Sequence, residues 1–229
     1  MTVMNNGLKY KLMPVANILS LIVLGLVLQI GGAYLVNAAV DLLGGSAADA
    51  ASAGAKAAVE YSAYMESIRA IEPRKFAHIL FVAPLIEEIV FRFLFLRAGK
   101  MVMPFWAANL VQAVLFGIYH TVMIQRVYGF IMGLMIGCVC HYCPIIYRKA
   151  TGKNDFPDTL LGVAITFVLH VVINATGLFV APLLPADIVI PLQIFIGLIM
   201  MALAAAACYM LMRQSRKENI NITMEPDRK

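Results

Sequence analysis

The chain has 229 residues, of which 62% are hydrophobic and only 14% carry a charged side chain. A soluble domain has about 25% charged residues, so this composition excludes an ordinary soluble enzyme or binding module. The formal net charge of +5 does not indicate a nucleic-acid partner, because the basic residues gather next to apolar runs, where membrane topology uses them. The partner that these numbers predict is a lipid bilayer.

Long apolar runs recur from one end of the chain to the other. Since a membrane-spanning helix needs about 20 mostly apolar residues, the sequence predicts six spans, at residues 13–40, 76–98, 103–122, 127–147, 159–181 and 188–212. We therefore expect an all-α, polytopic membrane bundle that forms a single domain over residues 1–229, with a polar tail at 213–229. The first run is too long for the 7–15-residue core of a signal peptide, so we interpret it as a retained span.

The basic residues predict the orientation of the bundle. If the N-terminus is cytoplasmic, 12 of the 18 lysines and arginines lie on the cytoplasmic side and 5 on the outer side, and Arg92 lies within the membrane. This asymmetry follows the positive-inside rule and predicts that both termini are cytoplasmic. The short chain and the lack of a retention signal for the endoplasmic reticulum favour a bacterial plasma membrane.

Residues 41–75 are expected to form an extramembrane loop. Ala, Gly and Ser dominate residues 42–58. Residues 59–72 then show a helical spacing of apolar and aromatic side chains, at Tyr61, Tyr64, Met65 and Ile68. This spacing predicts an amphipathic helix that Pro73 ends, lying in the membrane interface. We favour a linker helix over a lid or gate for substrate.

Two features of the fourth span concern packing and metal binding. Gly129, Gly133 and Gly137 recur at four-residue intervals, which lets another helix approach closely; we favour packing inside the bundle over dimerisation. The segment CVCHYC, residues 138–143, places three cysteines around His141. We favour buried apolar cysteines over a metal or redox cluster, since zinc sites usually show paired C-x₂₋₄-C spacings.

Ionisable and strongly polar side chains interrupt three of the spans. They are Glu87, Glu88 and Arg92 in the second span, His120 in the third, and His170 with Asn174 in the fifth. Each charged residue at the centre of a span costs about 2.5–3.5 kcal/mol on insertion scales, so such residues indicate a functional site. Singly, each group could be a tolerated ion pair, an interfacial histidine or hydrogen-bonding glue between helices.

Helical geometry separates the roles of the two glutamates. Glu88 and Arg92 are four residues apart, so they share a helix face and can form an ion pair. Glu87 points about 100° away from Glu88 and has no cation four residues later, since position 91 is Phe. Glu87 is therefore the carboxylate available for chemistry, and Pro84 is expected to bend the helix beside it.

A bundle that brings Glu87, His120 and His170 around one water would suit general-base catalysis. A buried carboxylate near imidazole groups can be tuned to accept a proton near neutral pH. A histidine or asparagine donor can hold the oxyanion that forms at a scissile carbonyl.

The three motifs together resemble a family of intramembrane proteases. E-E-x-x-x-R at residues 87–92, F-x-x-x-H at 116–120 and H-x-x-x-N at 170–174 occur in this order in apolar segments, as in the CAAX-protease and bacteriocin-processing (CPBP, or Abi) family. The resemblance covers about residues 76–181, which we take as the catalytic core.

The resemblance implies a role for each motif residue. It implies a helical membrane bundle that hydrolyses peptide bonds, in which Glu87 and His120 activate a water and His170 and Asn174 stabilise the oxyanion. Glu88, Arg92 and Phe116 would support the site.

The resemblance leaves the metal and the substrate open. Members of the family are often labelled metalloproteases, and if zinc were bound, Glu87, His120 and His170 would be its ligands. H-E-x-x-H is lacking, and we expect a glutamate-activated water without a metal cofactor. The expected function is an intramembrane endopeptidase acting on a membrane-associated peptide or protein. The alternative is a non-catalytic scaffold or bacteriocin-immunity protein of the same fold. The oligomeric state and the cleavage site are not predicted.

Overall fold

The computed structural model describes residues 2–44, 53–69, 73–151, 157–185 and 188–223. All regular secondary structure in these ranges is helical, and they contain no strand. The predicted all-α membrane bundle is thus confirmed.

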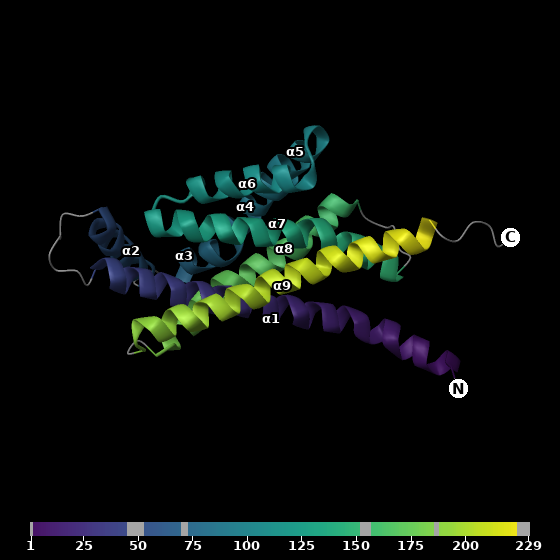
Figure 1. Ribbon diagram of the computed structural model, residues 1–229, viewed down its shortest axis with the longest axis horizontal. Coiled ribbons are helices and arrows are strands. Elements are labelled where there is room, and N and C mark those ends of the chain that lie inside the picture. Colours follow the sequence, from purple (N-terminus) through teal and green to yellow (C-terminus); the bar gives the residue numbers. More distant parts are fainter. Residues whose placement is uncertain (1, 45–52, 70–72, 152–156, 186–187, 224–229) are drawn as a thin grey trace.

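Four long helices run along the length of the molecule (Figure 1). They are α1 (Thr2–Gly44), α7 (Met123–Thr151), α8 (Asp158–Ala175) and α9 (Ile190–Thr223). Each contributes a stretch that is long and apolar enough to cross a membrane. These stretches are Leu19–Leu43, Met123–Arg148, Asp158–Leu183 and Ile190–Arg216. The third continues beyond α8 through η4 (Thr176–Val180) and η5 (Ala181–Leu183). They correspond to the first, fourth, fifth and sixth predicted spans, so the protein is an integral membrane protein.

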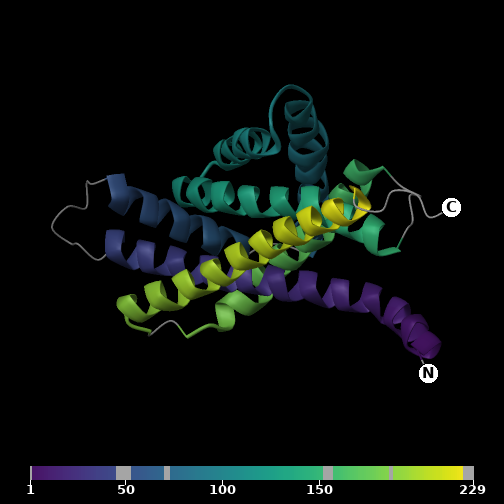
Figure 2. The ribbon, with the colours of Figure 1, turned by 45° about the vertical axis from the view of Figure 1, so that its right-hand side comes forward.

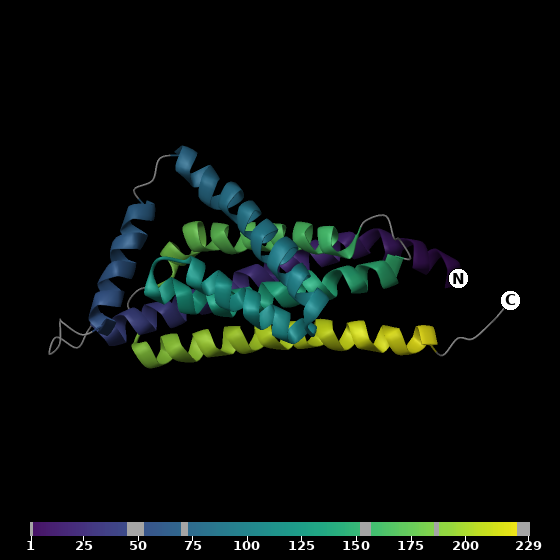
Figure 3. The same cartoon turned by 90° about the horizontal axis from the view of Figure 1, so that it is seen from above.

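The second predicted span, residues 76–98, lies in a composite helix that crosses the bundle obliquely (Figure 3). Its five consecutive parts are α3 (Pro73–Ala77), η2 (His78–Val82), α4 (Ala83–Glu87), η3 (Glu88–Leu96) and α5 (Arg97–Val102). The parts η2 and η3 are π-helical, a geometry frequently found at functional sites. The sequence predicted a bend at Pro84, and the helix changes from π to α geometry one residue before this proline.

The third predicted span, residues 103–122, contains the shorter helix α6 (Phe105–Tyr119). Its 15 residues rise about 22 Å at about 1.5 Å per residue. This is less than the hydrocarbon core of about 30 Å. Six complete crossings therefore remain a prediction, and four are supported by helix length and composition.

The core of the bundle joins the four long helices. Its buried side chains come from α1, α7, α8 and α9, and they are Leu24, Leu28, Met132, Ile136, Val139, Leu169, Ile173 and Ala204. Large apolar side chains on the other face of α9 are exposed, including Phe195, Leu198 and Leu203. In a membrane protein such a face contacts lipid.

The glycine stripe of α7 packs against α6 inside the molecule. A Cβ at Gly133 would lie 3.0 Å from the Cα of Ala113, and a Cβ at Gly137 would collide with the side chain of Asn109. Asn109 and Gln112 are fully buried and donate to the carbonyl groups of Leu134 and Gly133 on α7. The predicted role of the stripe, close packing inside the bundle, is thus confirmed.

The three cysteines of α7 belong to different packing clusters, and Cys143 packs against the core that joins the four long helices. Cys138 packs with Tyr142 and Cys208, whereas Cys140 packs with Leu96 and Ala108. His141 instead stacks on Phe105, and its Nδ1 lies 3.1 Å from Nζ of Lys100. The cysteines therefore do not gather around His141, and the favoured interpretation as buried packing residues fits this arrangement.

The predicted amphipathic helix exists as α2 (Ala53–Arg69), which lies beside the end of α1 (Figure 2). It begins six residues before the predicted segment 59–72. Pro73 starts the next helix, α3. The parts of the predicted loop at residues 45–52 and 70–72, like those of the polar tail at 224–229, lie outside the described residues.

Candidate active site

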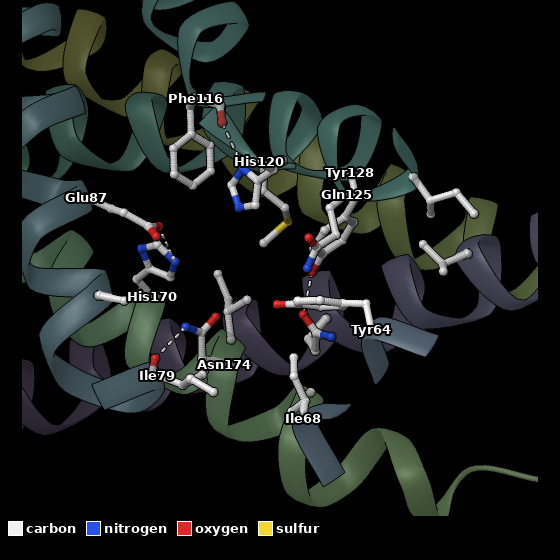
Figure 4. A pocket seen from close by; sticks show the side chains of 18 of the residues that line it. Tyr64, Ile68, Ile79, Glu87, Phe116, His120, Gln125, Tyr128, His170 and Asn174 are labelled. Atoms are coloured by element: carbon white, nitrogen blue, oxygen red, sulfur yellow. Dashed lines mark hydrogen bonds and ion pairs between the residues drawn. The ribbon is translucent and has the colours of Figure 1, made fainter. Parts of the chain in front are cut away.

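A cavity of about 520 Å³ opens in the bundle between α1, α2, the composite helix, α6, α7 and α8. Four of the side chains that line it are the predicted catalytic residues Glu87, His120, His170 and Asn174. Figure 4 shows them on one side of the cavity, with Tyr64 and Ile68 of α2 across from them. The fold thus brings together residues that are up to 87 positions apart in the sequence.

The two glutamates hold the ring of His170 between them. Nδ1 of His170 lies 2.8 Å from Oε1 of Glu88, and Nε2 lies 3.5 Å from Oε2 of Glu87. The carboxylate of Glu88 faces Arg92, so it acts as an acceptor, and the proton on this side of the ring belongs to Nδ1. Glu88 therefore fixes both the orientation and the tautomer of His170, a role that its predicted pairing with Arg92 did not include.

The contact between Glu87 and His170 requires one shared proton. An unprotonated Nε2 and an ionised carboxylate are both acceptors and would repel each other. A proton on either group converts the contact into a favourable one. The Glu87–His170 pair therefore holds one proton beside the cavity.

Arg92 supports this pair from the side opposite the cavity. Its Nε lies 3.3 Å from Oε2 of Glu88, and both side chains are 0% exposed. The distance is that of an ion pair, but the orientation does not meet the requirements of a hydrogen bond. The guanidinium carbon of Arg92 also lies 4.5 Å from the ring centre of Phe116, which is a cation–π contact.

Phe116 separates the support residues from the two histidines. Its ring meets those of His120 and His170 edge-on, with ring centres 5.0 and 6.0 Å apart. It is buried, and its other face carries the cation of Arg92. The arrangement fits the supporting position that was expected for Phe116.

His120 presents a hydrogen-bond acceptor to the cavity. Its Nδ1 lies 2.9 Å from the carbonyl oxygen of Phe116, and since a carbonyl only accepts, Nδ1 carries the proton. In the neutral ring, Nε2 then has a free lone pair. Figure 4 shows the ring of His120 near Glu87 and His170.

Arg126 holds the turn that carries His120. His120 follows the last residue of α6 and has an extended backbone. Nε of Arg126 donates to the carbonyl oxygen of His120 over 2.8 Å, and Nη2 donates to that of Thr121 over 3.2 Å. From the sequence, Arg126 was expected only as a charge on the outer side of the membrane, because a distance of six residues from His120 gives no helical signal.

Asn174 is tied to the irregular part of the composite helix. Its Nδ2 donates to the carbonyl oxygen of Ile79 over 3.0 Å. Pro84 has no N–H and cannot donate back to the carbonyls four or five residues earlier, which include that of Ile79. Pro84 therefore leaves the carbonyl oxygen of Ile79 available to accept from Asn174. The second N–H of the Asn174 side-chain amide remains for another partner.

Several residues that line the cavity were not predicted to be part of the site. The four side chains that gave α2 its amphipathic pattern, Tyr61, Tyr64, Met65 and Ile68, all border the cavity. Helix α2 therefore forms a wall of the site, which a simple linker would not do. Gln29 of α1 accepts a hydrogen bond from the hydroxyl of Tyr128 at the same cavity. Gln29 could have been found from the sequence, because it is a polar amide within an apolar span, as Asn174 is.

The described residues do not fit a metal centre as they are arranged. No three His, Cys, Asp or Glu side chains among them lie close enough together to hold one ion. Both ring nitrogens of His170 are directed at the two glutamates, whereas His120 keeps its Nε2 free. The expectation of a metal-free site remains a prediction.

The motif region matches a known family. Residues 73–176 match the family model described as Type II CAAX prenyl endopeptidase Rce1-like. The match includes all three motifs and the whole composite helix. No curated protein and no solved structure matches the chain.

Proposed function

Residues 73–176 form an Rce1-like domain of the CAAX-protease family, and on this premise we propose that the protein is an intramembrane endopeptidase with a glutamate-activated water. The observation that carries the proposal is the convergence of Glu87, His120, His170 and Asn174 on one cavity between membrane helices. The substrate class is a peptide or protein segment in the membrane.

The proposed water lies between Glu87 and His120. The carboxylate of Glu87 and the free Nε2 of His120 are both acceptors, so one water can donate one hydrogen to each. Its oxygen lone pair is then directed at a carbonyl carbon. As the oxygen attacks, Glu87 takes one proton, and it returns this proton to the nitrogen of the leaving amine.

The developing oxyanion would be held by His170 and Asn174. In the ionic form of the Glu87–His170 pair, Nε2 of His170 carries a proton and positive charge, and Asn174 has a second N–H beyond the one bound to Ile79. Preorganised donors of this kind commonly contribute a factor of about 10²–10³ each. Glu88 keeps the imidazolium oriented through Nδ1.

The proposal is tested with purified protein in proteoliposomes and a quenched-fluorescence peptide library. Glu87→Gln keeps the shape of the side chain and removes its basicity, so we expect cleavage to fall by about 10²–10⁴-fold. The matched control is Glu66→Gln, an exposed residue of α2 that does not border the cavity. Cleavage in ¹⁸O-water should label the new carboxyl terminus. Equal activity of Glu87→Gln and wild type would contradict the proposed chemistry, and no cleavage by any form would favour the scaffold alternative.

A further inference from the structure

A second, small cavity lies behind the ion pair of the active site, where α5 and the beginning of α8 meet α7. It has a volume of about 60 Å³. Its polar lining consists of Arg92, Arg97, Lys100, His141, Asp158 and Thr159. None of its described lining residues also borders the catalytic cavity. The catalytic proposal uses only Arg92 from this set, and as a support.

Arg92 brings unused hydrogen-bond donors to the small cavity. The residue is 1% exposed, and none of its three guanidinium nitrogens makes a hydrogen bond within the described chain. Glu88 neutralises its charge through Nε, while Nη1 and Nη2 lack an acceptor. A buried charged donor without a partner is unfavourable, so such groups indicate a ligand.

The N-terminus of α8 is the second source of donors. Asp158 and Thr159, its first two residues, line the cavity. The preceding Pro157 gives no side-chain cap, and α8 is 18 residues long. The first N–H groups of a helix have no partner within it and carry partial positive charge, which favours anions.

Two exposed cations complete the rim of the cavity. Arg97 and Lys100 lie one turn apart on α5, and both are exposed. Nζ of Lys100 donates to Nδ1 of a neutral His141, which leaves two of its N–H groups available. Both cations can therefore turn toward a ligand at the mouth without unfolding any helix.

Two acidic groups near this cavity, among the described residues, have cationic partners. Asp158 forms an ion pair with Arg148, and Glu88 forms one with Arg92. Arg97 and Lys100 remain as two positive charges that these acids do not neutralise. The described residues around the cavity therefore carry a net positive charge and offer more hydrogen-bond donors than acceptors.

We propose that this cavity binds a phosphate group, held by Arg92, the N-terminus of α8, and the exposed cations Arg97 and Lys100. A volume of 60 Å³ corresponds to about two water molecules at about 30 Å³ each, which suits one tetrahedral oxyanion. Helix α5, which borders the cavity, lies in the half of the bundle that is nearer the beginning of α1 and the end of α9 (Figure 1). At a membrane surface the phosphate can come from an anionic lipid headgroup or from solution, and the chemistry is the same.

The test measures the unfolding midpoint of the full-length protein in neutral detergent at about 0.15 M salt, where surface attraction is screened. The probes are short-chain phosphatidylglycerol, inorganic phosphate and short-chain diacylglycerol, which has no phosphate. The variant is the double substitution Arg97→Gln/Lys100→Gln. Its control is Arg213→Gln/Arg216→Gln, which removes the same charge from exposed positions on α9.

We expect a phosphate-bearing probe to raise the midpoint of wild type and of the control. The apparent Kd should be at least about tenfold weaker in Arg97→Gln/Lys100→Gln, since a hydrogen bond to a charged group contributes about 1.5–3 kcal/mol. If phosphatidylglycerol acts and inorganic phosphate does not, the ligand is a lipid headgroup. If inorganic phosphate acts equally, the ligand is free phosphate. Equal responses of both double variants, or no response of wild type, would overturn the proposal.

Thr159→Glu gives an independent test because it supplies an internal anion at the helix N-terminus. We expect this variant to unfold at a higher temperature than wild type without any ligand and to lose the response to phosphate. An unchanged response to phosphate in Thr159→Glu would also overturn the proposal.

Discussion

Replacement of Arg92 by alanine should destabilise the fold before it affects the chemistry. The side chains of Arg92 and Glu88 are both 0% exposed and are joined by the 3.3 Å contact. Removing one partner of a buried ion pair costs about 3–5 kcal/mol, because the other charge stays buried without compensation. Loss of the cation–π contact with Phe116 adds about 1–2 kcal/mol. Against a total stability of about 5–15 kcal/mol, this loss is expected to lower abundance in the membrane.

The assay compares membrane abundance by immunoblot and the unfolding midpoint in detergent. Arg97→Ala is the matched control, because Arg97 also lies over an aromatic ring, that of Phe93 at 5.3 Å, but is exposed. We expect the control to lose less than about 1 kcal/mol. The double variant Arg92→Met/Glu88→Gln should recover much of the stability, since it removes both charges together. If Arg92→Ala accumulates and unfolds like wild type and loses only turnover, the support role assigned to Arg92 is wrong.

Three further predictions follow from the packing and from the site. Gly137→Ala should destabilise the protein by about 1–3 kcal/mol in a detergent unfolding assay, because the new methyl group collides with Asn109; wild-type stability would contradict the packing of α6 on α7. Arg126→Gln should reduce turnover about tenfold or more at normal abundance, because it removes the two hydrogen bonds that hold the His120 turn; unchanged turnover would refute this positioning role. Treatment of the purified protein with a zinc chelator should leave turnover unchanged, and a loss that added zinc restores would show that a metal takes part.

The helices and the membrane location could be predicted because length and apolar composition determine them. The four long helices overlap the first, fourth, fifth and sixth predicted spans. The composite helix was predicted only as one apolar span, because π-helical turns depend on tertiary contacts and Pro84 alone does not specify them. The length of α6 was overestimated, since the apolar pattern continues through the turn that carries His120.

The convergence of the motif residues was a hypothesis that the family resemblance supported, because helix faces predict only contacts within one helix. The i, i+4 spacing predicted the pair Glu88–Arg92, which the structure contains. The bond from His170 to Glu88 joins residues 82 positions apart, and no local spacing encodes it. The place of α2 beside the cavity likewise depends on how the chain returns after α1. The amphipathic pattern identified its apolar face but not the surface that this face covers.

The central claim is that Glu87 activates a water for cleavage of a membrane-associated substrate. It is tested most directly by mass spectrometry of peptide termini from cells that carry either wild type or Glu87→Gln at equal membrane abundance. The account predicts termini that are present with wild type and missing with Glu87→Gln, and these would also identify the substrate and the cut site. Identical sets of termini across several growth conditions would contradict it and would favour a non-catalytic scaffold that keeps the three motifs.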